Sequence, residues 1–167
     1  MTRAAVRQAV AGDLPGIVHV YNQHVVAGAA TFDLDPVTVE DRKPWFERFS
    51  EEAPYRLLVA DIAGEVAGFA ASTPFRDRAG YRHTVETSVY LHPDHHGEGL
   101  GMRLMMELLE ALDHEGVHRA VAAVALPNDA SVGLHERLGF EEVGTMDQVG
   151  RKFDGWVDVR WYIRRAP

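Results

Sequence analysis

Hydrophobic and polar residues alternate along several short stretches of the chain, and this two-residue period is typical of β-strands. One of these stretches runs from Thr84 to Leu91 and is rich in β-branched and aromatic residues. The predicted strands cover residues 2–10, 55–61, 65–73, 84–91, 118–126, 140–149 and 156–163. Ala63-Gly64 separates two of them and predicts a hairpin turn.

Elsewhere apolar residues recur every three or four positions, which predicts helices. These helices cover residues 13–25, 38–49, 100–112 and 128–138. Asp13 is expected to cap the first helix. Thr38 with Asp41 resembles a capping box for the second. Asn128 or Asp129 begins the last.

The order of these elements predicts one α/β domain spanning residues 1–167, with a mixed central β-sheet and helices on both faces. A ligand crevice is expected where neighbouring strands of the sheet part. Met102, Met105 and Met106 lie at helical spacing with leucines, and we expect them to pack in the core.

Composition and charge narrow the range of partners. The chain is 46% hydrophobic, enough for a sizeable core, and its formal charge of -8 argues against a nucleic-acid partner. It has no cysteine, so a disulfide, a Cys-based zinc site and a thiol nucleophile are excluded. No stretch approaches the roughly 20 apolar residues of a membrane helix. We therefore expect a cytoplasmic protein without a membrane partner.

A strand, a glycine-rich loop and a helix follow one another between residues 84 and 110. Gly97, Gly99 and Gly101 let the backbone approach a ligand, and the free N–H groups of the first helical turn favour an anion. A Walker A loop is excluded because Gly101 is followed by Met102-Arg103, and a dinucleotide fingerprint fits poorly. The residues alone leave a coenzyme A turn and a ligand-free helix start as alternatives.

Two segments carry a resemblance to a known family. These are VYLHPDHHGEGLG (residues 89–101) and NDASVGLHERLGF (residues 128–140). Together they resemble the GNAT superfamily of acetyl-CoA-dependent N-acetyltransferases. Four further segments are similar to its phosphinothricin and methionine sulfone acetyltransferase branch: VYNQHV, TFDLDPVT, ETSVY and VGRKFDGWVDV. The resemblance covers nearly the whole chain.

This resemblance implies a GNAT fold in which a splayed strand pair forms the cleft for acetyl-CoA, the cosubstrate. The implied cofactor-binding residues are Val89, Tyr90 and Leu91 for pantetheine, His96, Gly97, Glu98, Gly99, Leu100, Gly101 and Met102 for the pyrophosphate, and Asn128 for the pantetheine amide. His96 departs from the family, which usually has Arg or Gln at this position. The branch also implies a homodimer.

Acetyl transfer to an amine needs a base and stabilisation of the thiolate leaving group. With the resemblance, Glu86 is the candidate base and His135 a candidate acid. The alternatives are a salt bridge between Glu86 and a nearby arginine, and a histidine that only packs.

Candidate substrate-binding residues come from three parts of the chain: Arg76, Arg78 and Tyr81, Thr31 and Phe32, and Trp156. Paired guanidinium groups suit a carboxylate or phosphinate. The alternatives are a solvated charged loop and core aromatics. The branch implies amino-acid-like acceptors such as phosphinothricin, methionine sulfone and methionine sulfoximine. Another amine, such as a polyamine, an antibiotic or a protein N-terminus, and a non-catalytic acyl-CoA-binding module remain alternatives.

Three clustered histidines, His92, His95 and His96, could suggest a metal site. Their proline and glycine neighbours are already explained by the loop, and a metal site usually includes a carboxylate. We therefore expect no metal.

Overall fold

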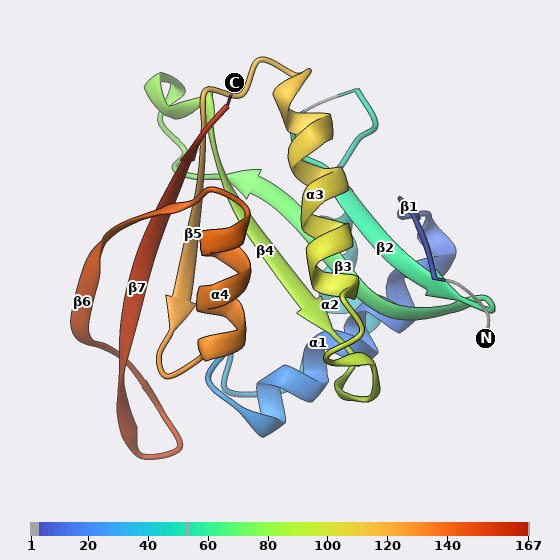
Figure 1. The fold of residues 1–167 in the computed structure, drawn as a ribbon. Helices are drawn as coiled ribbons and strands as arrows, with labels where there is room; N and C mark the ends of the chain where they lie inside the picture. The colour runs from blue at the N-terminus through green and yellow to red at the C-terminus, as the bar shows by residue number, and fades with distance from the viewer. Residues whose placement is uncertain (1–3, 53, 167) are drawn as a thin grey trace.

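The structure is a computed structural model that describes residues 4–52 and 54–166. Its elements run in the order β1 (Ala5–Gln8), α1 (Leu14–Ala27), α2 (Val39–Phe46), β2 (Leu57–Ile62), β3 (Glu65–Pro74), β4 (Thr84–Leu91), α3 (Leu100–Asp113), β5 (Arg119–Ala125), α4 (Asp129–Arg137), β6 (Glu141–Lys152) and β7 (Gly155–Arg165) (Figure 1). Short 3-10 turns lie at Ala11–Asp13, Ala79–Tyr81 and Pro93–His95.

The strands form one seven-stranded sheet in the order β1-β2-β3-β4-β5-β7-β6. β4 and β5 pair in parallel, and the other pairs of adjacent strands in this order are antiparallel. The sheet is therefore mixed, which confirms the predicted fold class. The hairpin between β2 and β3 is also confirmed, with Ala63 and Gly64 both at positive φ.

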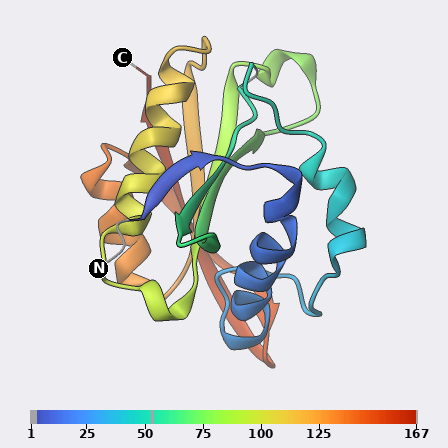
Figure 2. The ribbon, with the colours of Figure 1, turned by 90° about the vertical axis from the view of Figure 1, so that its right-hand side faces the viewer.

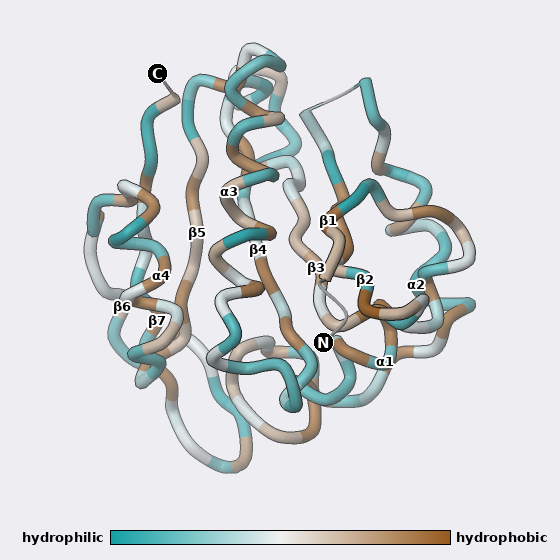
Figure 3. Tube along the Cα trace, turned by 45° about the vertical axis from the view of Figure 1, so that its right-hand side comes forward, coloured by the Kyte–Doolittle hydropathy of each residue, from teal (hydrophilic) through white to brown (hydrophobic). Residues whose placement is uncertain are grey.

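Helices cover both faces of the sheet, with α1 and α2 on one side and α3 and α4 on the other (Figure 2). Side chains alternate between the two faces, so Leu57 and Val59 pack with α1 while Leu58 and Ala60 pack with α3. Hydrophobic residues recur along the strands and on one side of the helices, whereas the connecting loops are mostly hydrophilic (Figure 3).

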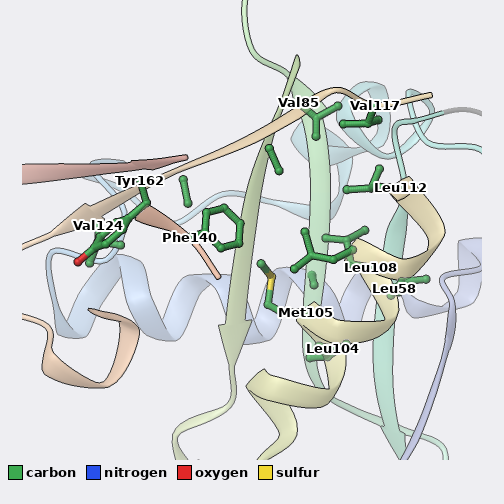
Figure 4. Close-up of a cluster of buried hydrophobic side chains, with 14 of the residues drawn as sticks. Leu58, Val85, Leu104, Met105, Leu108, Leu112, Val117, Val124, Phe140 and Tyr162 are labelled. Atoms are coloured by element: carbon green, nitrogen blue, oxygen red, sulfur yellow. The ribbon is translucent and has the colours of Figure 1, made fainter. Parts of the chain in front are cut away.

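The larger core lies under α3, where Leu104, Met105 and Leu108 are fully buried in one cluster that also includes Val85 of β4 (Figure 4). The predicted core position of Met106 is wrong, because this side chain is 56% exposed. One residue after Met105 the helix has turned by about 100°, which carries Met106 off the buried face.

Two of the three predicted N-terminal helix caps are formed. Thr38 forms the predicted capping box with Asp41, and Asn128 accepts a hydrogen bond from the backbone N–H of Ser131. Asp13 precedes α1 but makes no side-chain cap, because its carboxylate binds Arg7 instead. In the described part of the chain, no helix has the length and apolar composition needed to cross a membrane.

Candidate active site

A cleft opens where β4 and β5 separate. Their parallel pairing covers Thr84 to Glu86 and then stops, and the Thr87 hydroxyl donates to the Val121 carbonyl at 3.3 Å just beyond it. Each strand keeps its outer partner, since β4 stays paired with β3 and β5 with β7. The two strands therefore diverge toward their ends (Figure 1). The cleft between them has a volume of about 780 Å³.

Most of the predicted cofactor-binding residues line this cleft: Val89, Tyr90, Leu91, His96, Gly97, Gly99, Gly101, Met102 and Asn128. Two predicted residues do not. The Glu98 side chain lies 3.2 Å from His95 on the outside, and Leu100 is buried in the core. Neither residue lines the cleft.

The glycine loop has the backbone geometry of an anion cradle. Gly97 and Gly99 have φ of +78° and +76°, a left-handed conformation that glycine adopts at little cost. Gly99 is the residue that precedes α3, whose first N–H groups are free of helical partners. A Cβ on Gly97 or Gly99 would meet no atom within 4 Å, so the space above the loop is open. A pyrophosphate fits these features.

Two histidines converge on the carbonyl oxygen of Leu91 at the end of β4. His24 Nε2 donates to it at 2.8 Å, and His96 Nε2 lies 3.4 Å away. Both rings line the cleft, and burial lowers the pKa of the His24 imidazole. The unusual loop histidine therefore shares its backbone partner with a second histidine from α1.

Glu86 is half-buried and lines two cavities at once. Burial raises the pKa of its carboxyl group, and the charge of Arg76 acts in the opposite direction. Within residues 4–52 and 54–166, no partner for the Glu86 carboxylate lies within salt-bridge distance. The expected alternative, a salt bridge with a neighbouring arginine, is not formed in that part of the chain.

The second cavity lies between β4 and the α1–α2 side of the sheet and has a volume of about 220 Å³. It shares Glu86, Ser88 and Tyr90 with the cleft. Its other lining residues are Ile17, Val18, Tyr21, Arg42, Trp45, Phe69 and Thr73. Glu86 thus lies at the junction of the cleft and the smaller cavity.

His135 of α4 is buried and lines the cleft. Its Nδ1 lies 2.8 Å from the Ser131 carbonyl oxygen, so Nδ1 carries the proton and the neutral ring has a lone pair on Nε2. In the described part of the chain Nε2 has no hydrogen-bond partner. Burial lowers the pKa of this imidazole, which disfavours the doubly protonated form.

Thr31 and Phe32 line the cleft from the loop after α1. Lys152, for which the sequence predicted no role, donates from Nζ to the Thr31 carbonyl at 2.8 Å. Gly150 lies directly against the Phe32 ring, and a Cβ there would come within 2.3 Å of it. The β6–β7 hairpin therefore fixes the position of this loop.

The remaining predicted substrate residues line neither cavity. Arg76 and Arg78 are exposed, and the Arg76 guanidinium lies 4.3 Å above the Phe75 ring. Tyr81 is 45% exposed and Trp156 is 62% exposed. In the described part of the chain, no group of three or more His, Asp or Glu side chains is arranged to hold a metal.

Several lining residues were not predicted, including His24, Arg42 and Trp45. Arg42 and Trp45 lie one turn apart in a helix that the sequence did predict, but nothing local indicates which cavity that turn faces. His24 lies in one of the segments that carry the family resemblance, although no role was assigned to it.

Comparison with known proteins identifies the class. The model of the Acetyltransferase (GNAT) family matches residues 21–140, and the chain belongs to this family. Together with the cleft and its glycine loop, this makes the protein an acetyl-CoA-dependent N-acetyltransferase. The predicted family and cosubstrate are thereby confirmed.

Individual relatives place the chain within the family. It is 45% identical to the phosphinothricin N-acetyltransferase of Streptomyces coelicolor, over 95% of this chain and 94% of the relative. It is 43% identical to the L-methionine sulfoximine/L-methionine sulfone acetyltransferase of Pseudomonas paraeruginosa, over 93% and 91%. Among solved structures, the phosphinothricin acetyltransferase of Sinorhizobium meliloti in complex with acetyl-CoA superposes with a TM-score of 0.93, at 35% identity over 99% and 89% of the two chains.

Proposed function

We propose that this enzyme transfers the acetyl group of acetyl-CoA to the primary amine of a small amino-acid-like acceptor of the phosphinothricin, methionine sulfone or methionine sulfoximine type. The main observation is the position of Glu86, which lines both the cleft and a small cavity on the other side of β4. The names of the relatives support this class of acceptor.

Glu86 acts as the general base. An ammonium group is not nucleophilic, so the acceptor must lose a proton, to the carboxylate directly or through water. The raised pKa of the half-buried carboxyl brings its basicity closer to that of the amine, which makes the proton transfer easier. Acetyl-CoA supplies the activated acyl group as a thioester.

The glycine loop and the first turn of α3 hold the pyrophosphate through backbone N–H groups. The backbone of Val89, Tyr90 and Leu91 and the side chain of Asn128 hold the pantetheine arm. Beyond Glu86 the cleft side of β4 has no strand partner, although the Leu91 carbonyl already accepts a hydrogen bond from His24.

His135 accepts a hydrogen bond instead of donating one. The bond from Nδ1 to the Ser131 carbonyl leaves the lone pair on Nε2, and the lowered pKa disfavours the imidazolium. The acid role predicted from the sequence needs a proton on Nε2. We therefore assign to Nε2 the binding of a donor group of the cosubstrate in the cleft.

Acceptor binding involves both sides of Glu86. Thr31 and Phe32 form a wall of the cleft, and Arg76, Arg78 and Tyr81 lie on an exposed loop outside it. The charge of Arg76 acts on Glu86, so we assign to Arg76 the attraction of an anionic acceptor, and to Arg78 the same role because it lies on the same exposed loop.

A homodimer would cover the exposed edge of the sheet. β6 is the last strand, and large apolar side chains of the β6–β7 hairpin are exposed: Val143, Met146, Val149, Phe153 and Trp156. Such a patch on an edge strand is typical of an interface. Sedimentation should give a dimer, and Met146→Glu should shift it toward monomer. We place the enzyme in the cytoplasm, where acetyl-CoA is available.

A coupled thiol-release assay with an amine panel tests the proposal. Phosphinothricin, methionine sulfone and methionine sulfoximine should be acetylated with a higher kcat/KM than spermidine, an aminoglycoside or a peptide N-terminus. A preference for one of the last three would replace the acceptor class. CoA binding without turnover of any amine would indicate a non-catalytic acyl-CoA-binding module.

A further inference from the structure

The small cavity beside Glu86 contains one cation and one anion. Among its lining residues, Arg42 is the basic side chain and Glu86 the acidic one. The remaining lining is largely aromatic and aliphatic, including Trp45, Phe69 and Tyr90. Two opposite charges therefore face one cavity of about 220 Å³, whose other polar side chains include those of Thr73 and Ser88.

Packing fixes the Arg42 guanidinium in position. Its central carbon lies 4.2 Å above the Tyr21 ring and 5.0 Å from the Trp45 ring. Contacts of this kind hold a planar guanidinium and leave its edge N–H groups available. The side chain therefore needs little reorganisation to bind a ligand.

The nearest carboxylate to Arg42 is only a weak partner. Asp33 lies 3.6 Å from a guanidinium nitrogen, beyond hydrogen-bond distance, while the Tyr21 hydroxyl donates to the same Asp33 oxygen at 2.7 Å. In residues 4–52 and 54–166, no side-chain hydrogen bond of Arg42 is formed. The guanidinium thus keeps donors for an incoming anion, while Asp33 limits its freedom to move.

We propose that Arg42 binds the α-carboxylate of the acceptor and thereby makes the enzyme selective for free α-amino acids. An α-amino acid carries an ammonium and a carboxylate on one carbon, and Glu86 and Arg42 present the two complementary charges to one cavity. This inference rests on the proposed function and adds a specificity-determining residue to it. Arg76 and Arg78, by contrast, are exposed and line neither cavity.

The arrangement discriminates by leaving hydrogen-bond donors of Arg42 unused. An amine without a carboxylate, such as a polyamine or a peptide N-terminus, would enter the cavity and leave the guanidinium with only Asp33, whose carboxylate lies 3.6 Å away. An unsatisfied, largely buried donor costs more than a missing favourable contact, so rejection of such amines should be strong.

The test uses two acceptors that differ only at the carboxylate: L-methionine sulfone and its carboxamide. Arg42→Gln removes the charge and keeps a polar side chain. We expect kcat/KM for the acid to fall about 10- to 100-fold, mainly through KM, while kcat/KM for the carboxamide changes less than about 3-fold. For each acceptor, kcat/KM of the variant is divided by that of the wild type, and the two quotients are compared. The different basicity of the two amines therefore cancels.

Three further variants sharpen the result. Arg42→Lys keeps the charge without the planar fork and should recover part of the preference for the acid. Arg48→Gln makes the same chemical change on an exposed side chain just beyond α2 and should leave both acceptors unaffected. Arg76→Gln removes a charge that only attracts the acceptor, so it should lower the ratio between acid and carboxamide much less than Arg42→Gln does. Loss of that ratio in Arg76→Gln but not in Arg42→Gln would overturn the proposal.

Calorimetry with the CoA-bound protein separates this inference from the proposed function. Binding of the acid, and its loss in Arg42→Gln, is measured whether or not turnover occurs. If the wild type turns over neither acceptor but binds the acid through Arg42, the proposed function fails, whereas the role of Arg42 in binding the carboxylate stands. If the wild type does not bind the acid, or if Arg42→Gln loses equal affinity for both acceptors, Arg42 does not bind the carboxylate.

Discussion

Replacing Glu86 by glutamine removes the charge at the junction of the two cavities and keeps the shape of the side chain. Within the described residues the carboxylate has no salt-bridge partner, so the substitution breaks no ion pair that holds the site together. The predicted effect is therefore chemical. Loss of a positioned general base lowers the rate by about 10²- to 10⁴-fold.

The pH dependence identifies the cause of that loss. In the wild type, kcat/KM should rise with pH through the raised pKa of Glu86, because only the carboxylate accepts a proton. The Glu86→Gln variant should lack this rise. Its deficit should narrow as the pH approaches the pKa of the acceptor amine, where fewer acceptor molecules need a base.

Stability measurements provide the control. Since burial raises the folded-state pKa of Glu86, its protonated form contributes stability that is present below the unfolded value and is lost as the pH rises through the folded value. At neutral pH the buried carboxylate therefore costs stability. Glu86→Gln should unfold at an equal or higher denaturant concentration. Unchanged kcat/KM at neutral pH, or a loss explained by weaker acetyl-CoA binding, would refute the role of Glu86 as base.

Three other predictions concern the cleft and the sheet. Gly99→Val should weaken CoA binding at least about 10-fold by calorimetry, because φ of +76° strains a β-branched residue and its side chain fills the anion cradle. Equal affinity would remove the loop as the pyrophosphate site. Gly68→Ala places a Cβ 2.8 Å from a backbone oxygen of β4. It should lower the free energy of unfolding, measured in urea, by about 1–3 kcal/mol. Gly12→Ala is the control, because a Cβ at Gly12 meets no atom within 4 Å. Burial lowers the pKa of His24 and His135 in the folded protein, so their neutral forms contribute stability above about pH 6.5 that is lost as the pH falls. The urea midpoint should therefore be lower at pH 5.5 than at pH 7.5. An unchanged midpoint would contradict this.

Much of the fold could be predicted because local rules determine it. The bounds of β4 are those that its alternation predicted, and the capping box at Thr38 and Asp41 forms as expected. The exceptions depend on partners distant in the chain or on the helix face. Asp13 binds Arg7 instead of capping α1, and Met106 lies off the buried face of α3.

The site was predictable where one continuous segment builds it. The glycine loop and β4 are adjacent in sequence, so their spacing already indicated an anion site next to Glu86. Arg42 and His24 come from helices that the sequence does not place relative to β4, and their roles needed the packed structure. Conversely, the sequence placed Arg76 and Arg78 close to β4, but their side chains are exposed.

The most direct test of the central claim is the stoichiometry of one reaction. Purified protein, acetyl-CoA and L-methionine sulfone should yield free CoA and N-acetyl-methionine sulfone in a one-to-one ratio, as followed by thiol titration and mass spectrometry. Glu86→Gln should slow both products equally at neutral pH. Release of CoA without the N-acetyl product, or no reaction with any α-amino acid, would contradict the account.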